Sequence, residues 1–174
     1  MDKITWGNEM EEIKIDTIYG TGDFEKDFVD VIELCGTWWK DSLFYKKYGI
    51  EYSVDKEWFN TIKNYGLIYT CGRQDGKLVS CYVGIKSPYM FNPKVMTSNE
   101  IVWCIRKENR SYRELIDLMI AIDKLMEKNN IELWNLAVSN ENIYESTGNF
   151  LERKKYTLMD KVYSRREQWQ NSQP

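Results

Sequence analysis

An amphipathic helix between two β-rich runs is the feature that most constrains the fold of this chain. Between Ser111 and Asn129, apolar side chains recur at helical spacing and form one stripe, made of Leu115, Leu118, Met119, Ile122, Leu125 and Met126. A continuous apolar strand pattern precedes the helix at residues 99–107, and a run typical of a buried strand follows it at 131–138. Strands joined by such a crossover helix lie parallel, and the crossover is right-handed. The sequence therefore predicts a βαβ unit over residues 99–138.

The sequence ahead of this unit predicts an antiparallel sheet with helices beside it. Asp75-Gly76 separates two β-rich runs, which is the strongest short signal for a β-hairpin. A helix is expected after Asp23, whose side chain can cap it, and two shorter helical pieces are expected at 41–64. The near-alternating isoleucines of residues 11–18 predict a first strand. The expected fold class is α/β, with a mixed sheet that is antiparallel in its N-terminal half and parallel in its βαβ unit.

The remaining segments complete this prediction. Pro88 and Pro93 suggest a loop between the hairpin and the next strand. Residues 140–147 suggest a short helix, and residues 150–166 suggest one or two closing strands. A chain of 174 residues fits one domain. We expect that domain at residues 1–168, followed by a flexible tail at 169–174.

Composition excludes several classes of function. The chain has no histidine, so serine and cysteine triads and imidazole metal ligands are excluded. A net charge of -3 argues against nucleic-acid binding as the main task. No apolar run approaches the length of a membrane span, and the N-terminus carries no secretory signal pattern. We therefore expect a cytoplasmic protein without a membrane or nucleic-acid partner.

The cysteines form no C-x-x-C pair. They are Cys35, Cys71, Cys81 and Cys104, and three of them stand inside apolar stretches. This pattern is typical of reduced thiols in the core of a cytosolic protein. It does not support a zinc site, and no metal is expected.

The order of these elements resembles the GNAT N-acetyltransferase superfamily. The stretch from Glu100 to Leu115 looks like the fourth strand of that family, its pyrophosphate loop and the start of the next helix. Residues 139–150 are similar to a family segment that ends in Asn-x-x-x-x-x-Tyr-x-x-x-Gly-Phe, with one extra residue between Gly148 and Phe150. Residues 75–90 look like the hairpin and proline-bearing loop of GNAT-like proteins from tailed bacteriophages. The resemblance covers about residues 10–166 and implies a GNAT fold.

The resemblance also implies a place for acetyl-CoA, between the strands at 99–106 and 131–138. The residues it assigns to the cofactor are Cys104, Ile105, Lys107, Arg110, Ser111, Tyr112, Arg113, Glu114, Leu115 and Asn140. The family writes its pyrophosphate loop as Arg/Gln-x-x-Gly-x-Gly/Ala, because small residues let the phosphates approach the amides of a helix N-terminus.

Here Arg113 and Leu115 stand where the small residues belong. Two interpretations follow from this departure. Arg110 and Arg113 could grip phosphate through their side chains. Alternatively, the site has decayed, and the basic residues from Arg106 to Arg113 form a solvated turn or a partner surface.

Two further residues take chemical roles by the same resemblance. Glu100 occupies the strand that bears the catalytic glutamate in histone-acetylating GNATs, which implies a general base. Tyr144 stands at the family's tyrosine, which implies the acid that protonates the leaving thiolate. Asn140 could bind the pantetheine arm, or it could cap the helix that follows.

The expected function is acetyl-CoA-dependent N-acetylation by direct attack, in a protein encoded by a phage. The acceptor would be a protein lysine, an N-terminus or a small amine, and it could belong to a host protein. A monomer or a homodimer would suit this activity. The alternative is a degenerate GNAT-fold binding protein that engages or inhibits a host or defence protein, or that belongs to the virion.

Overall fold

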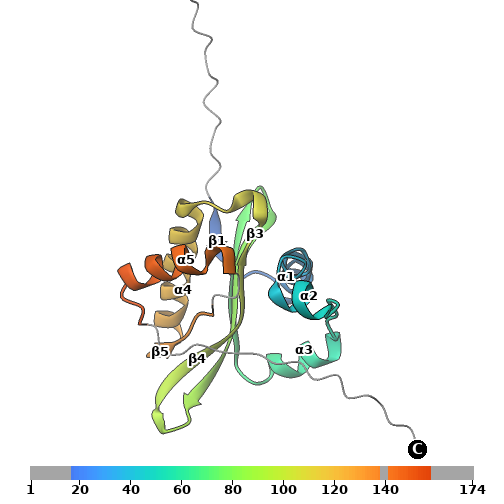
Figure 1. Cartoon of the computed structure of the whole chain (residues 1–174). Helices are drawn as coiled ribbons and strands as arrows, with labels where there is room; N and C mark the ends of the chain where they lie inside the picture. The colour runs from blue at the N-terminus through green and yellow to red at the C-terminus, as the bar shows by residue number, and fades with distance from the viewer. Residues whose placement is uncertain (1–16, 138–140, 158–174) are drawn as a thin grey trace, which may run out of the picture.

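A computed structural model describes residues 17–137 and 141–157 of the chain (Figure 1). The elements run in the order β1 (Ile18–Gly20), α1 (Phe24–Trp39), α2 (Leu43–Tyr48), α3 (Lys56–Lys63), β2 (Leu67–Gln74), β3 (Lys77–Tyr89), β4 (Asn92–Ile105), the 3-10 helix η1 (Lys107–Asn109), α4 (Tyr112–Lys128), β5 (Leu133–Trp134) and α5 (Glu141–Arg153). Among the described residues, no helix is long and apolar enough to span a membrane.

One sheet organises the described chain, with its strands in the order β1-β2-β3-β4-β5. β1 to β4 are antiparallel neighbours, whereas β4 and β5 are parallel and are joined through α4. The mixed sheet and the βαβ unit predicted from the sequence are therefore confirmed. Asp75 and Gly76 have φ angles of 48° and 77°, the left-handed conformation that a tight two-residue hairpin turn requires.

Helices cover both faces of the sheet: α1 lies on one side, and α4 and α5 lie on the other (Figure 1). The alternation of side chains along β3 supplies both cores. Cys81 and Val83 face the helix α1, while Tyr82 is buried with Leu118 and Ile122 of α4. Two apolar layers, one on each side, thus hold the middle strands in place.

The helix ends follow the capping signals in the sequence. The Asp23 side chain accepts a hydrogen bond from the Lys26 amide at the start of α1. Ser111 does the same for the Glu114 amide at the start of α4. Beyond α4, Asn130 takes a left-handed conformation with a φ of 52°, which asparagine tolerates at the end of a helix.

The loop predicted around Pro88 and Pro93 is wrong, because β3 and β4 continue through both prolines as one long hairpin. Pro88 pairs with Met96, and Figure 1 shows this hairpin extending past the neighbouring strands. The pairing of β2 with β3 ends at Leu67 and Ile85, so β3 has β4 as its neighbour where Pro88 lies. A proline has no N–H to donate, and it is tolerated where one side of its strand makes no ladder bonds.

The C-terminal elements also differ from the prediction. β5 is two residues long instead of spanning 131–138, and its Leu133 is 47% exposed. α5 continues to Arg153, so the first residues of the predicted closing strands are helical. Phe150 and Leu151 are adjacent and both buried, which a helix allows and an alternating strand does not. Residues 154–157 form a turn and an irregular segment, so no part of the predicted closing strands that the structure describes is a strand. Residues 158–166 of those strands, the tail and most of the first predicted strand lie outside the described residues.

Candidate active site

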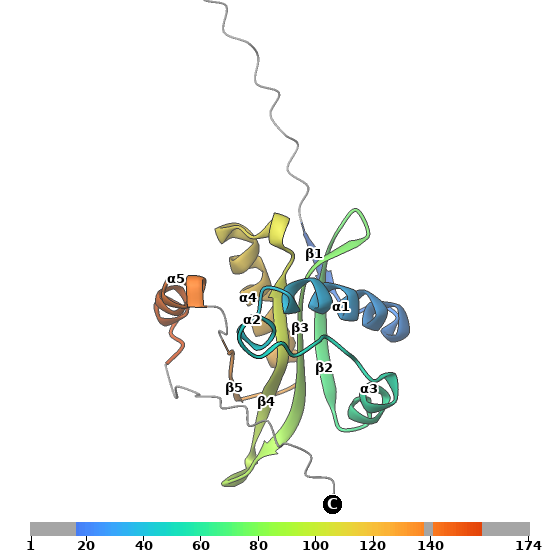
Figure 2. The same ribbon diagram turned by 45° about the vertical axis from the view of Figure 1, so that its right-hand side comes forward.

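Strands β4 and β5 part soon after they pair. Their pairing joins Thr97 to Leu133 and Ser98 to Trp134, and Figure 2 shows the following segment leading away from β4. Side chains of β4 bridge the gap to a single residue, Ala137. The Trp103 indole N–H donates to the Ala137 carbonyl at 2.7 Å, and the Glu100 carboxylate accepts a hydrogen bond from the Ala137 amide. The sequence predicted the parallel pair, but it gave no sign of this bridge.

A β-bulge lies beside Glu100. Val83 pairs with Val102 whereas Gly84 pairs with Glu100, so Ile101 is an extra residue in β4. A Cβ atom at Gly84 would lie 2.6 Å from the Ser98 and Tyr82 side-chain oxygens, so any larger residue here would displace this pair of hydroxyl groups. Bulges re-aim the side chains next to them and are frequent at active sites.

The Glu100 carboxyl has an environment suited to proton transfer. It is half-buried, and this burial raises the pKa of Glu100 to about 7, although the hydrogen bond from the Ala137 amide acts to lower it. The Glu100 amide donates to the Asn135 side-chain oxygen at 3.4 Å, which ties the same residue to the segment after β5. A carboxyl group whose pKa lies near neutral pH can act as a general base toward an attacking amine at that pH.

The N-terminus of α4 lies a short way along the chain from the end of β4. Ser111 is the N-cap of the helix. Its hydroxyl accepts a hydrogen bond from the Glu114 amide at 3.1 Å, and its carbonyl accepts one from the Leu115 amide at 3.1 Å. The amides of Tyr112 and Arg113 precede the first intrahelical bond, so helix geometry directs them outward. Together with the helix dipole, such amides favour a phosphate group.

The arginines around this helix end each pair with an acid from the described chain. Arg106 lies 3.5 Å from Glu33, Arg110 lies 3.9 Å from Asp41, and Arg113 lies 3.7 Å from Asp117. Arg106 also donates to the Leu78 carbonyl and is largely buried. The Arg110 and Arg113 pairs are partly exposed, and contacts of that kind contribute little, so an anionic ligand could replace them.

Glu114 is directed into the protein. It is buried, and its carboxylate accepts hydrogen bonds from Thr17 at 2.6 Å, from Ser80 at 2.8 Å and from the Tyr19 hydroxyl. Burial and the contact with Glu114 both raise the pKa of Tyr19. These contacts tie the first turn of α4 to β1 and β3.

The other residues assigned to the cofactor have different surroundings. Ile105 and Leu115 pack against the core on the α4 side, and the Cys104 thiol is buried on the α1 side. Lys107 lies exposed in η1, and the ring of Tyr112 stands edge-on to Phe150 of α5 at 5.3 Å between centroids. Tyr144 belongs to α5, and Asn140 lies outside the described residues.

Solved structures resemble this chain in their overall fold. An aminoglycoside acetyltransferase from an uncultured soil metagenomic sample, in complex with sisomicin, matches 90% of this chain and 97% of its own with a TM-score of 0.64 and 10% identity. The fold is that of the GNAT acetyltransferases.

Two further GNAT structures agree with this result. A ribosomal-protein-alanine N-acetyltransferase from Brucella melitensis matches 87% of this chain and 99% of its own, with a TM-score of 0.61 and 11% identity. A Clostridium acetobutylicum structure described as a predicted acetyltransferase with acetyl-CoA matches 86% of this chain and 96% of its own, with a TM-score of 0.57 and 13% identity. No protein-family model matches the sequence, and no curated protein matches it.

Proposed function

We propose that this protein is an acetyl-CoA-dependent N-acetyltransferase. The observation that carries the proposal is the Glu100 carboxyl, with its pKa of about 7, at the point where β4 and β5 part. An amine must lose a proton to attack a thioester, and a carboxyl of this kind supplies the base that a chain without histidine otherwise lacks. The GNAT fold of the neighbours supports the same reaction class.

The residues present fit acetyl-CoA at two places. The α4 N-terminus offers outward amides to the pyrophosphate, with Arg110 and Arg113 close by as side-chain donors. Leu115, which stands where the family has a small residue, packs into the core. Because Leu115 packs inward, its side chain is less of an obstacle to a phosphate at the helix end. Arg113 is then the main difference from the family's loop. The parted strands offer the second place, where Glu100 and Trp103 contact Ala137 across the gap.

The bound cofactor would supply an acetyl group on a thioester. Glu100 would take the proton of the attacking amine, directly or through one water molecule. Its contact with the Ala137 amide is compatible with this role, since a carboxylate has about four lone-pair sites. Tyr144 would give a proton to the departing thiolate, and Asn140 would bind the pantetheine arm. The amine would attack directly, without a covalent intermediate on the enzyme.

The same chemistry requires an acceptor whose amine becomes neutral when Glu100 removes its proton. A protein lysine, a protein N-terminus and a small amine all meet this condition, and the neighbours named above include enzymes for an aminoglycoside and for a ribosomal protein. Phage origin, a cytoplasmic site of action, a host protein as acceptor, and a monomeric or homodimeric state stay predictions from the sequence.

Calorimetric titration with acetyl-CoA tests the proposal. We expect the wild type and Glu100→Gln to bind with similar dissociation constants, on the order of micromolar, because Glu100 acts on the amine and not on the phosphates. The matched control is Glu132→Gln, an exposed acid just ahead of β5. An absence of binding heat and of thermal stabilisation at millimolar acetyl-CoA would refute the enzyme.

A second candidate is a GNAT-fold binding protein without a cofactor. Arg113 at a glycine position of the pyrophosphate loop favours it, since a long side chain can hold phosphate away from the helix amides. Arg113→Ala separates the two candidates, with Lys124→Ala on the exposed side of the same helix as the control. If the side chain grips phosphate, the Arg113 variant loses acetyl-CoA affinity by roughly tenfold. If the loop has eroded, the same variant gains affinity, and that result would support the binding protein.

A further inference from the structure

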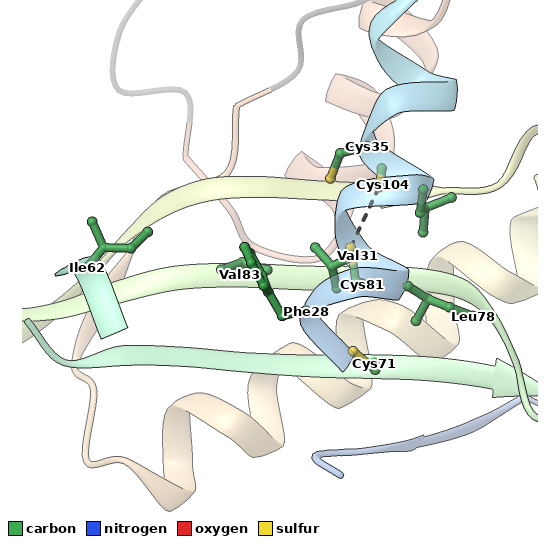
Figure 3. Packing of buried hydrophobic residues seen from close by; sticks show 10 residues of the cluster. Phe28, Val31, Cys35, Ile62, Cys71, Leu78, Cys81, Val83 and Cys104 are labelled. Carbon is green, nitrogen blue, oxygen red and sulfur yellow. Dashed lines mark hydrogen bonds between the residues drawn. The ribbon is translucent and has the colours of Figure 1, made fainter. Parts of the chain in front are cut away.

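Three of the four cysteines meet in the core on the α1 side of the sheet. Cys35 comes from α1, Cys81 from β3 and Cys104 from β4, and their sulfur atoms all lie within 4.8 Å of one another (Figure 3). Cys81 and Cys104 stand directly opposite each other in the β3–β4 ladder, with 3.6 Å between their sulfurs. All of these are free thiols. We call Cys35, Cys81 and Cys104 the thiol triad.

The surroundings of the thiol triad are apolar. Cys35 is 9% exposed, Cys81 is 0% exposed and Cys104 is 4% exposed, and their neighbours in the core include Val31, Leu34 and Val83. No carboxylate of the described residues belongs to the group, and the chain has no histidine. The group therefore offers sulfur ligands alone, in a medium where an uncompensated charge is costly.

The fourth cysteine is a neighbour but not a member. Cys71 lies on β2 opposite Cys81, on the same face of the sheet, yet its sulfur is outside the group. In Figure 3 the side chain of Cys71 stands apart from the other three. The arrangement is thus a set of three ligands, and structural zinc and iron–sulfur centres characteristically use four.

We propose that the thiol triad is a binding site for a soft trivalent metalloid, with arsenic(III) as the probe. At a pyramidal trivalent centre, bonds of about 2.3 Å to sulfur place three sulfur atoms about 3.5 Å apart. Cys81 and Cys104 already stand 3.6 Å apart, and all three sulfur atoms lie within 4.8 Å of one another. Soft thiolate ligands select soft centres. A trivalent centre bound to three thiolates is neutral, so it suits an apolar core, whereas Zn(II) or Cu(I) with three thiolates would leave a net negative charge there.

The uptake reaction balances without an oxidant or a base. Arsenite, As(OH)₃, exchanges its hydroxyl groups for the thiols, so that three As–O bonds break and three As–S bonds form. Each thiol proton leaves with a hydroxyl group as water, which makes three water molecules, and the arsenic stays trivalent. The product links α1 covalently to β3 and β4, so binding fixes that helix on the sheet. The three side chains lie in the core on the α1 side of the sheet, and the proposed acetyl transfer uses none of their thiols.

Native mass spectrometry of the reduced full chain with arsenite tests the proposal. We expect one adduct whose mass gain is that of one arsenic atom minus three hydrogen atoms, together with a rise in the melting temperature. Cys35→Ala, Cys81→Ala and Cys104→Ala should each lose this adduct. Cys71→Ala is the matched control, a buried thiol of the same face, and it should keep the adduct.

The wild-type mass is decisive even where a core variant folds poorly, because the chain has only four cysteines. A wild-type adduct that has lost only two thiol hydrogen atoms would mean that two cysteines bind the arsenic, and it would overturn the proposal. The absence of any adduct would do the same. Loss of the adduct in Cys71→Ala would overturn the choice of ligands. Binding of zinc in place of arsenite under the same conditions would overturn the argument from charge.

Discussion

Two acidic side chains, Glu100 on β4 and Glu114 in the first turn of α4, are at least partly withdrawn from solvent, and their surroundings differ. Glu114 accepts hydrogen bonds from three hydroxyl groups, those of Thr17, Tyr19 and Ser80. The carboxylate of Glu100 accepts one from the Ala137 amide, and burial raises its pKa to about 7. A carboxylate satisfied by several fixed donors anchors structure, while one that burial holds near neutrality can exchange a proton. The difference lies in the neighbours, since the residue type is the same.

The largest expected effect is the loss of activity on removing the carboxyl of Glu100. Glu100→Gln keeps an oxygen that can accept from Ala137 but removes the base, so we expect kcat to fall by roughly 10²- to 10⁴-fold with little change in acetyl-CoA affinity. In the wild type, kcat/KM should rise with pH through about 7, because the ionised carboxyl is the active form. Steady-state kinetics across pH 5.5–8.5 measures both effects. A pH profile that Glu100→Gln leaves unchanged would remove the assigned role.

A smaller effect is expected on stability at Glu114. Glu114→Ala takes the acceptor away from three hydroxyl groups and loosens the first turn of α4, and we expect a loss of about 3 kcal/mol in the free energy of unfolding. That corresponds to a melting temperature lower by roughly 6–12 °C for a chain of this size. Glu127→Ala, on an exposed position of the same helix, should change stability by less than about 0.5 kcal/mol. Equal melting temperatures for the two variants would mean that Glu114 is not an anchor.

The smallest effect concerns how stability varies with pH. The pKa of Glu100 is raised from 4.5 to about 7 in the folded protein, so between these values the folded state holds more protons than the unfolded state. The contribution of this carboxyl to the free energy of unfolding therefore falls as pH rises through that window, and it is least favourable at high pH. Glu100→Gln does not titrate at this position. Between pH 4.5 and 7.5 its melting temperature should therefore rise relative to that of the wild type, by an amount equivalent to about 2.5 to 3 kcal/mol. A constant difference across the range would show that the carboxyl ionises as in water.

Much of the fold could be predicted because it rests on local patterns. The stripe of α4, the Asp75-Gly76 turn and the capping residue Asp23 are encoded within a few residues of where they act. The β3–β4 hairpin was predicted wrongly at Pro88, because a proline is excluded from a strand only where both sides make ladder bonds. The number of neighbours that a strand has is a property of the sheet.

The candidate site was predictable only in part for the same reason. The resemblance pointed to Glu100, and Glu100 lies on a strand as predicted, although that strand, β4, runs from Asn92 to Ile105. The bulge at Ile101 depends on the register between β3 and β4. Ala137, which Glu100 and Trp103 both contact, carries no side-chain signal that a sequence pattern could use. Glu114 was placed with the cofactor residues by its position in the loop, and its inward direction comes from partners on β1 and β3.

The sequence by itself determined the order of the helices and strands as far as β5, the parallel βαβ unit and the lack of any imidazole chemistry. The elements follow from periodicity, which can be read within short stretches of chain. The lack of imidazole follows from composition, which does not depend on the order of residues. The tertiary structure alone decided which carboxyl is poised to exchange a proton and which is an anchor, and it alone brought Cys35, Cys81 and Cys104 together. Burial, hydrogen bonding and sulfur–sulfur distances arise between residues that are far apart in sequence, so they exist only once the chain has folded.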